Sequence, residues 1–386
     1  MSLFHHRHKI EYAFRREVNE LYASLTVKNI AFRLITIFEP IYFYLFFDKE
    51  ILPVLWYFGL VYLGFGLVSP LAGKILSRIG IKHSILISVF FAILYFIGLR
   101  SLTTYSSLIY VIPFLSILYK LFFWPAFHLD FARFSQGDRR ARQVSILKMI
   151  TLASGILSPF VGGLIIFHYG YSVLFIIVVV LLFTSVFPLF LSKEVYNTFH
   201  FSMKDFFRSL FKPALRRTEI ALVAWGVEEL AASLVWPIFI FLIIADYSVI
   251  GGITSAATVV AFLSAYWIGR LADKKGRRKV LRIGAVLTSL SWIFRSVTSN
   301  AIQIAFADGV YKLSQETSYI GFTSVIYDKA SKKESQTLPF ILMREVILNT
   351  GRFLGIVAIA IIIALTGSLA PAFIFAAISS LFLMFL

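Results

Sequence analysis

The amino-acid sequence predicts an all-α membrane protein with twelve transmembrane helices in two pseudo-symmetric six-helix bundles. First, 59% of the 386 residues are hydrophobic, 15% are charged, and the mean hydropathy is +0.83, whereas about a quarter of the residues of a soluble domain are charged. Second, the charged residues gather between long apolar runs, each near or above the roughly 20 residues that a membrane-spanning helix needs. Third, landmarks of the first half recur 196 or 197 residues later, which indicates a duplicated half.

Six expected spans precede a long polar segment, and six follow it. The spans cover residues 21–46, 51–72, 83–100, 105–127, 143–166, 171–192, 218–244, 250–271, 279–297, 301–326, 338–364 and 369–386. The expected domains are an N-terminal tail at 1–20, a first bundle at 21–192, a linker at 193–217 and a second bundle at 218–386. The tail is polar and lacks the apolar stretch of a cleavable signal peptide, so none is expected.

The linker contains an expected amphipathic helix. Met203, Phe206, Phe207, Leu210 and Phe211 recur at helical spacing, with basic residues off that face. Such a helix is expected to lie in the membrane interface.

Positive charge is distributed unevenly along the chain. Basic residues cluster in the tail and after the second, fourth, sixth, eighth and tenth spans, and few stand in the other loops. By the positive-inside rule, both termini and the linker are cytoplasmic, and the protein is a multi-pass plasma (inner) membrane protein in contact with lipids. The formal charge of +17 is therefore assigned to membrane orientation, and nucleic acid is excluded as a partner.

The sequence also excludes several chemistries. The chain has no cysteine, so disulfides, thiolate catalysis and cysteine metal sites are ruled out. No nucleophile–base pair, metal-ligand cluster or phosphate-binding loop has recognisable spacing. We therefore expect no enzyme activity, no metal and no cofactor.

The chain carries two copies of a basic turn between spans. The second copy, with Asp273 as its one acid, has its defining residues at Gly269, Asp273, Lys274, Gly276, Arg277 and Arg278. The first copy keeps Gly73, Arg78 and Gly80 but has Ser77 at the acid position. Asp273 is expected to accept hydrogen bonds from a helix N-terminus or an arginine.

These turns and the two six-helix halves resemble the major facilitator superfamily, and the resemblance covers essentially the whole chain. It implies that the acid of the turn latches a cytoplasmic gate, so the latch is expected at Asp273 rather than at Ser77. The alternative is that the turn only anchors the chain by its positive charge.

The span at 143–166 carries a second motif, made of Ser154, Ser158, Pro159, Gly162 and Gly163. It resembles the antiporter signature of the superfamily's drug exporters, with serine at its first two glycine positions. The equally favoured alternative is close helix packing through small residues. Lys120 stands in the span where many exporters of the family carry a basic residue.

Charges inside the apolar spans are costly and mark a polar pathway. The substrate and proton pathway is expected to comprise Arg33, Glu39, Lys120, Glu228, Glu229, Asp308, Lys312 and Glu316. They fall in the first, fourth, seventh and tenth spans, which line the central cavity in the family that the chain resembles.

Three expectations concern how these charges pair. Asp308, Lys312 and Glu316 lie on one helix face, and either serve transport or neutralise one another. Arg33 and Glu229 are 196 residues apart and are expected to face each other across the pseudo-twofold axis. Glu39 is the first candidate for a proton-carrying carboxylate, the alternative being a permanent salt bridge.

The resulting prediction is a monomeric secondary transporter of small molecules that works by alternating access, coupled to protons, with efflux of amphipathic compounds as its favoured direction. A nutrient symporter or uniporter for a polar solute is the alternative. A non-transporting receptor or scaffold is less favoured, because the chain has no large soluble module.

Overall fold

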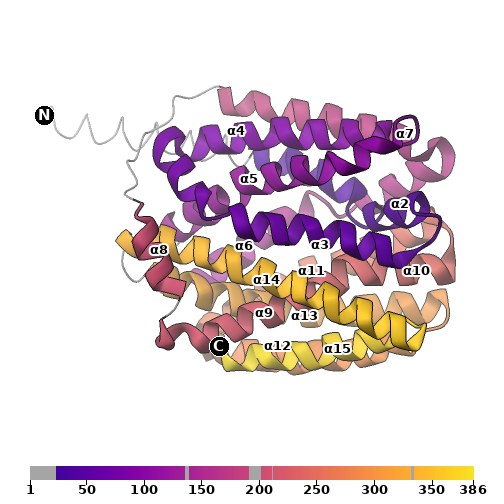
Figure 1. The fold of residues 1–386 in the computed structure, drawn as a ribbon. Helices are drawn as coiled ribbons and strands as arrows, with labels where there is room; N and C mark the ends of the chain where they lie inside the picture. The colour runs from indigo at the N-terminus through magenta and orange to yellow at the C-terminus, as the bar shows by residue number, and fades with distance from the viewer. Residues whose placement is uncertain (1–22, 135–138, 191–200, 211, 332–333) are drawn as a thin grey trace, which may run out of the picture.

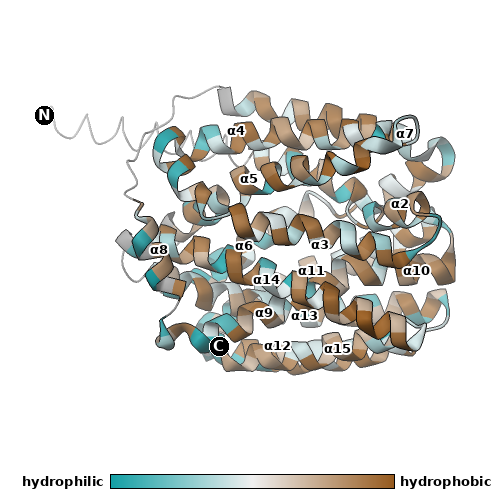
Figure 2. Ribbon diagram, in the orientation of Figure 1, coloured by the Kyte–Doolittle hydropathy of each residue, from teal (hydrophilic) through white to brown (hydrophobic). Residues whose placement is uncertain are grey.

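The computed structural model describes residues 23–134, 139–190, 201–210, 212–331 and 334–386, and in these ranges the chain is helical without a strand (Figure 1). The helices run side by side along one axis. Hydrophobic residues cover their middle portions, and hydrophilic residues gather towards the ends (Figure 2). This distribution fits a multi-pass membrane protein.

The first bundle begins with a broken helix. Ala23–Ile35 and α2 (Glu39–Phe46) meet at an angle of 40°. The other elements of this bundle are α3 (Ile51–Val68), α4 (Leu71–Ser101), η1 (Ser106–Tyr110), α5 (Ile112–Phe134), α6 (Arg140–Ala153), α7 (Ser158–Val186) and η2 (Phe187–Phe190).

The second bundle follows a short helix, α8 (Met203–Leu210). Its elements are η3 (Pro213–Leu215), α9 (Arg216–Leu230), the π-helical turn η4 (Ala231–Val235), α10 (Trp236–Ile244), α11 (Tyr247–Lys275), α12 (Arg277–Ser296), α13 (Ala301–Ala330), α14 (Glu334–Thr366), α15 (Ala370–Leu381) and η5 (Phe382–Phe385).

Two long helices turn back on themselves, so the helix count differs from the number of crossings. In the described ranges, seven helices are long and apolar enough to cross a membrane, or eight with the bent first pair. However, α4 breaks at Gly80 and α7 at Gly170, with φ of 78° and 76°, a conformation that glycine adopts readily. With these reversals and the shorter helices, the path matches the twelve expected crossings.

Equivalent breaks occur in the first helix of each bundle. Pro40 stands at the start of α2, and Pro237 at the start of α10 just after the π-helical turn. A proline cannot donate the backbone hydrogen bond of a regular helix. The repeated proline therefore marks a repeated break.

The first bundle lies above the second in Figure 1, and two helix pairs join them. Helices α6 and α7 pack along α11, and α3 packs along α14. We call the end of the molecule that holds α8 the basic end, and the other end the opposite end. Successive crossings place the α11–α12 junction and the start of α6 at the basic end.

Helix α8 falls within the segment expected to be amphipathic. Phe206 is buried, whereas Phe207 is 52% exposed, so the apolar face is only partly covered by protein. Residues 193–200 and Phe211 of that segment lie outside the described residues, and its place in a membrane interface stays a prediction.

Candidate functional site

Asp273, near the end of α11, binds the beginning of α6 in the other bundle. Its carboxylate accepts hydrogen bonds from the backbone N–H of Arg142 at 2.9 Å and of Ala141 at 3.3 Å. The first N–H groups of a helix lack partners within the helix and favour an anion there. A Cβ on Gly269 would lie 2.2 Å from Ser145 Oγ, so the glycine permits this close approach.

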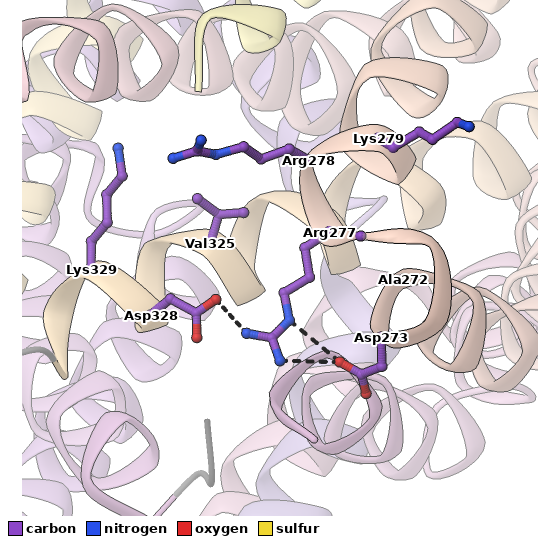
Figure 3. A pocket seen from close by; sticks show the side chains of 9 residues that line it. Ala272, Asp273, Arg277, Arg278, Lys279, Val325, Asp328 and Lys329 are labelled. Carbon is purple, nitrogen blue, oxygen red and sulfur yellow. Dashed lines mark hydrogen bonds and ion pairs between the residues drawn. The ribbon is translucent and has the colours of Figure 1, made fainter. Parts of the chain in front are cut away.

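A second carboxylate extends this contact. Asp328, near the end of α13, accepts a hydrogen bond from Arg140 of α6 at 2.8 Å and also pairs with Arg277 of α12. Arg277 in turn contacts Asp273 at 3.1 Å (Figure 3). Two acids and two arginines therefore join the two bundles. We use the name basic-end gate for Asp273, Asp328, Arg140, Arg277 and Arg142.

A pocket of about 490 Å³ lies beside the gate. Besides Asp273, Arg277 and Asp328, its lining includes Arg278 and Lys329, whose side chains approach each other in Figure 3. Arg278 is exposed. The pocket therefore belongs to the surface of the basic end.

One layer further inward, α5 contacts two helices of the second bundle. His128 Nδ1 lies 2.7 Å from the Tyr327 hydroxyl, and His128 Nε2 lies 3.7 Å from Glu345. Glu345 also pairs with Arg344. Glu345 and His128 are buried, so this polar contact lies in the bundle interface itself.

The middle of the molecule contains a group of charges that we call the α13 cluster. It comprises Arg33 of the first helix, Lys148 of α6, and Lys312, Glu316 and Tyr319 of α13. Lys148 Nζ lies 3.2 Å from Glu316 and 4.1 Å from the centroid of the Tyr319 ring. Arg33 interacts electrostatically with Glu316 and Tyr319. Lys312 interacts electrostatically with Arg33 and with Lys148. The cluster spans both bundles.

A second central group lies around Glu39, and we call it the Glu39 cluster. Glu39 accepts a hydrogen bond from Tyr95 of α4 and interacts electrostatically with Lys120 of α5. Lys120 also interacts with Glu229 and Arg352, which form an ion pair of 2.6 Å within the second bundle. The Glu229 side chain is 38% exposed, which indicates water-accessible space beside it.

Further interior charges form a network inside the second bundle. Arg295 pairs with Asp308, and Trp236 donates to Asp308 at 3.1 Å. Glu228 accepts hydrogen bonds from the Tyr311 hydroxyl at 2.6 Å and from Trp292 at 3.2 Å. The Arg295 guanidinium lies 3.5 Å from the Tyr311 ring centroid. We call these six residues the Arg295 network.

Comparison with known proteins decides the family. The family model described as Major Facilitator Superfamily matches residues 30–245, which is more than half of the chain. The chain belongs to the major facilitator superfamily. It is therefore a secondary transporter of small molecules in a membrane, and not an enzyme.

Individual relatives of this superfamily member are distant. An uncharacterized protein of Bacillus subtilis (strain 168), YqgE, is 22% identical over 306 residues, which cover 76% of this chain and 71% of the relative. Two solved structures share the fold. The human organic anion transporter MFSD10 is 12% identical with a TM-score of 0.73, covering 96% and 99% of the two chains. The fucose:proton symporter FucP, in the outward conformation, is 13% identical with a TM-score of 0.69, covering 95% and 96%.

The superfamily's basic turn has different surroundings in its two copies. A Cβ on Gly73 would lie 2.6 Å from the ring of Phe201, and Arg78 is exposed. Ser77 bonds only within its own helix, to Lys74 at 2.9 Å. In the second copy, Lys274 is exposed as well. Of the two copies, only the second has an acid that contacts the other bundle.

The residues of the motif from Ser154 to Gly163 lie at helix contacts. A Cβ on Gly162 would lie 2.1 Å from the carbonyl oxygen of Leu34. A Cβ on Gly163 would lie 2.2 Å from the carbonyl oxygen of Tyr247. Ser154 and Ser158 flank the break between α6 and α7, and Pro159 follows at the start of α7. The Ser154 hydroxyl bonds the carbonyl of Thr151 in its own helix. These contacts support the packing alternative.

The ion pairs of these acids differ from the pairing expected for Glu229 and from the self-neutralising alternative for α13. Glu229 pairs with Arg352 of its own bundle and not with Arg33. Asp308 and Glu316 bind Arg295 and Lys148, so the acids of α13 do not find their ion-pair partners within that helix. In both cases a closer partner comes from a neighbouring helix.

The sequence analysis did not select several residues that carry these contacts. They are His128, Arg140, Tyr327 and Asp328 at the interface, Tyr95 beside Glu39, and Arg295 in its network. Asp328 is an acid next to a basic loop, which is the one signal that distinguishes it.

Proposed function

We propose that this protein is a proton-coupled transporter whose two bundles rock around the central charges. The observation that carries the proposal is the Lys148–Glu316 ion pair of 3.2 Å, which joins the two bundles between α6 and α13. An ion pair between two moving bodies must break when they separate, so solute or proton binding there changes the relative stability of two states.

The proposal assigns the basic end to the cytoplasm and gives it an ionic gate. Arg140, Arg277, Asp273 and Asp328 hold this end closed by charge-assisted hydrogen bonds. Such bonds are stronger than neutral ones when they are partly withdrawn from water. The protein acts as a monomer in the plasma (inner) membrane. Both termini lie in the cytoplasm, because the positive-inside rule places the basic end there.

The opposite end closes by packing instead of charge. A Cβ on Gly163 would lie 2.2 Å from the Tyr247 carbonyl, and one on Gly251 would lie 2.3 Å from that of Pro159. The Tyr171 and Tyr247 rings lie 5.7 Å apart. Apolar contacts of this kind separate without leaving a charge unpaired, so the two gates respond differently to salt and pH.

Glu39 is the proposed proton carrier. Its hydrogen-bond partner is the Tyr95 hydroxyl, whereas Glu229 is already paired with Arg352. A protonated Glu39 keeps a hydrogen bond with Tyr95 but loses its attraction to Lys120. Proton binding there therefore changes the contact between the first helix and α5. The fucose:proton symporter has the same fold and is named for proton coupling.

Two transport directions are compatible with this mechanism. Efflux of an amphipathic compound is supported by rings beside the central charges, such as Tyr319 near Lys148 at 4.1 Å and Tyr62 near Arg352 at 5.1 Å. Symport of a polar solute is supported by the charges themselves. The direction of the proton gradient distinguishes the two. Symport accumulates the solute on the side towards which protons flow, and antiport accumulates it on the side from which they flow.

The test uses purified protein in proteoliposomes. A thermal-shift screen of sugars, peptides, organic acids and drugs at pH 6 and pH 8 supplies the most stabilising compound as the probe. A pH gradient is expected to drive accumulation of that probe by wild type and by the exposed-residue control Glu50→Gln. Glu39→Gln is expected to retain exchange without a gradient and to lose gradient-driven accumulation. An unchanged response to pH in Glu39→Gln removes Glu39 from the mechanism.

A further inference from the structure

We propose that the solute is a small anion whose negatively charged group binds between Arg33, Lys148 and Lys312. This inference names the substrate class of the transporter proposed above and rests on that proposal. It comes from a charge imbalance in the α13 cluster.

The α13 cluster brings three cations to one carboxylate. Arg33, Lys148 and Lys312 come from three different helices, and Glu316 is the carboxylate of the cluster. Glu316 forms its ion pair with Lys148, at 3.2 Å. Lys312 interacts electrostatically with both other cations, so it lies close enough to be repelled by each of them. The cluster therefore has an excess of two positive charges.

The neighbouring acids do not correct this excess, because each is already paired with another cation. Asp308 interacts with Lys312 but forms its ion pair with Arg295. Glu229 pairs with Arg352 at 2.6 Å, and Glu345 pairs with Arg344. Each of these pairs is neutral as a unit. In the described part of the chain, the excess charge at Arg33 and Lys312 has no ion-pair partner from the protein.

The position of the cluster makes this imbalance costly. Lys312 is the twelfth of the 30 residues of α13, which places it about 16 Å from the start of that helix at 1.5 Å per residue. Unpaired charges at this depth are expensive in a membrane and mark ion or substrate sites. Arginine remains protonated under these conditions, so Arg33 cannot relieve the repulsion by losing its charge.

The surroundings of Arg33 keep a planar donor group available. A Cβ on Gly155 would lie 2.3 Å from Arg33 Cδ, so the arginine stem lies against the glycine of the α6–α7 break. Guanidinium groups bind carboxylates and phosphates through two parallel hydrogen bonds. Tyr319 adds a hydroxyl and a ring beside Lys148.

The arrangement also explains how binding acts on transport. Arg33 and Lys148 belong to the first bundle, and Lys312 belongs to the second. An anion bound to all three relieves their repulsion and holds the bundles together. Movement of one monovalent anion with one proton in the same direction is electrically neutral, which links this site to Glu39.

The experiment measures thermal unfolding of the full chain in detergent at constant ionic strength. The probes are sodium benzoate, sodium succinate and sodium phosphate, with glucose and tetraethylammonium chloride as neutral and cationic comparisons. At least one anion is expected to raise the melting temperature of wild type. The variants are Lys312→Gln, Lys312→Arg and, as a matched control, Arg282→Gln on the exposed face of α12.

Lys312→Gln is expected to melt higher than wild type without a probe, because it removes a repulsive buried charge. It should also need about tenfold to a hundredfold more anion for the same stabilisation, as expected for a lost charged hydrogen bond of about 1.5–3 kcal/mol. Lys312→Arg and Arg282→Gln should respond like wild type. A variant that merely folds poorly would melt lower, and that result counts against the proposal.

Three results would overturn the inference. In the first, glucose or tetraethylammonium raises the melting temperature but none of the anions does. In the second, no anion raises the melting temperature. In the third, the anions raise the melting temperatures of wild type and Lys312→Gln equally. Proteoliposome uptake separates this inference from the transport proposal. If the stabilising anion binds but is neither accumulated nor exchanged by wild type, the proposed function fails while the anion site stands.

Discussion

Arg140, at the start of α6, and Asp328, near the end of α13, are joined by a hydrogen-bonded ion pair of 2.8 Å that crosses from one bundle to the other. The Arg140 side chain is 5% exposed and the Asp328 side chain 34%. The pair is therefore buried on one side and open to solvent on the other. Such a position suits a contact that forms and breaks, because water can reach the acid when the bundles separate.

The same acid also serves the basic turn. Asp328 pairs with Arg277, which reaches Asp273, and Asp273 binds the N-terminus of α6. The two carboxylates and Arg277 thus connect three helices of the second bundle to one helix of the first. The opposite end has no equivalent ion pair among the described residues. Its contacts are close approaches of glycines, aromatic rings and a hydrogen bond of 3.1 Å from the Phe160 backbone N–H to Ser255 Oγ.

The first prediction concerns the Arg295 network. Arg295→Met leaves Asp308 buried without its ion pair, which is expected to cost about 3–5 kcal/mol of stability. The double variant Arg295→Met with Asp308→Leu should recover most of that loss, because both buried charges are gone. Arg282→Met, an exposed position on the same helix, should change stability by less than about 0.5 kcal/mol.

Thermal or denaturant unfolding in detergent is measured for all four proteins. Tryptophan fluorescence, to which Trp236 and Trp292 of the network contribute, follows the transition. A single variant Arg295→Met as stable as wild type would show that the network contributes nothing to folding.

The second prediction concerns the backbone of the basic turn. Gly276 has φ of 95° and ψ of 127°, a region that residues with a side chain adopt at a cost of about 1–3 kcal/mol. Gly276→Ala should therefore lower the melting temperature. Gly309 lies within α13 with open space where a Cβ would stand, so Gly309→Ala should match wild type or melt higher by the equivalent of up to about 1 kcal/mol. Equal melting temperatures for the two variants would argue that the turn relaxes without strain.

The sequence predicts the fold well because lipid imposes simple rules on it. The span 51–72 follows from length and hydropathy alone, and α3 occupies it. Helix α13 occupies the expected span 301–326, but it is not among the helices that are apolar enough to qualify by hydropathy. The main departure is that the second crossing continues beyond residue 72 to the break at Gly80. The expected end of this span is too early, because the basic residues of the turn are typical of a loop. In the structure they belong to the last helical turns of the crossing.

The pairing of charges is less predictable, because it depends on side-chain direction and on the nearest helix. The repeat places Arg33 and Glu229 at equivalent positions, yet Arg352 is nearer to Glu229. Helical spacing correctly puts Asp308 and Glu316 on α13 but cannot show that α12 and α6 supply their partners. Asp328 was missed because it stands at the end of a span beside lysines, where a solvated charge is the usual interpretation.

Hydrogen–deuterium exchange of wild type and Asp328→Asn in nanodiscs tests alternating access most directly, with Glu50→Gln as the exposed control. Loss of the Asp328 charge weakens the basic-end gate, so amides near the start of α6 and the α11–α12 junction should exchange faster. If the bundles rock as rigid bodies, amides near the end of α7's first segment and the start of α11, at the opposite end, should exchange more slowly. Faster exchange at the basic end with no added protection at the opposite end would contradict the account, because it would mean local loosening without coupled motion.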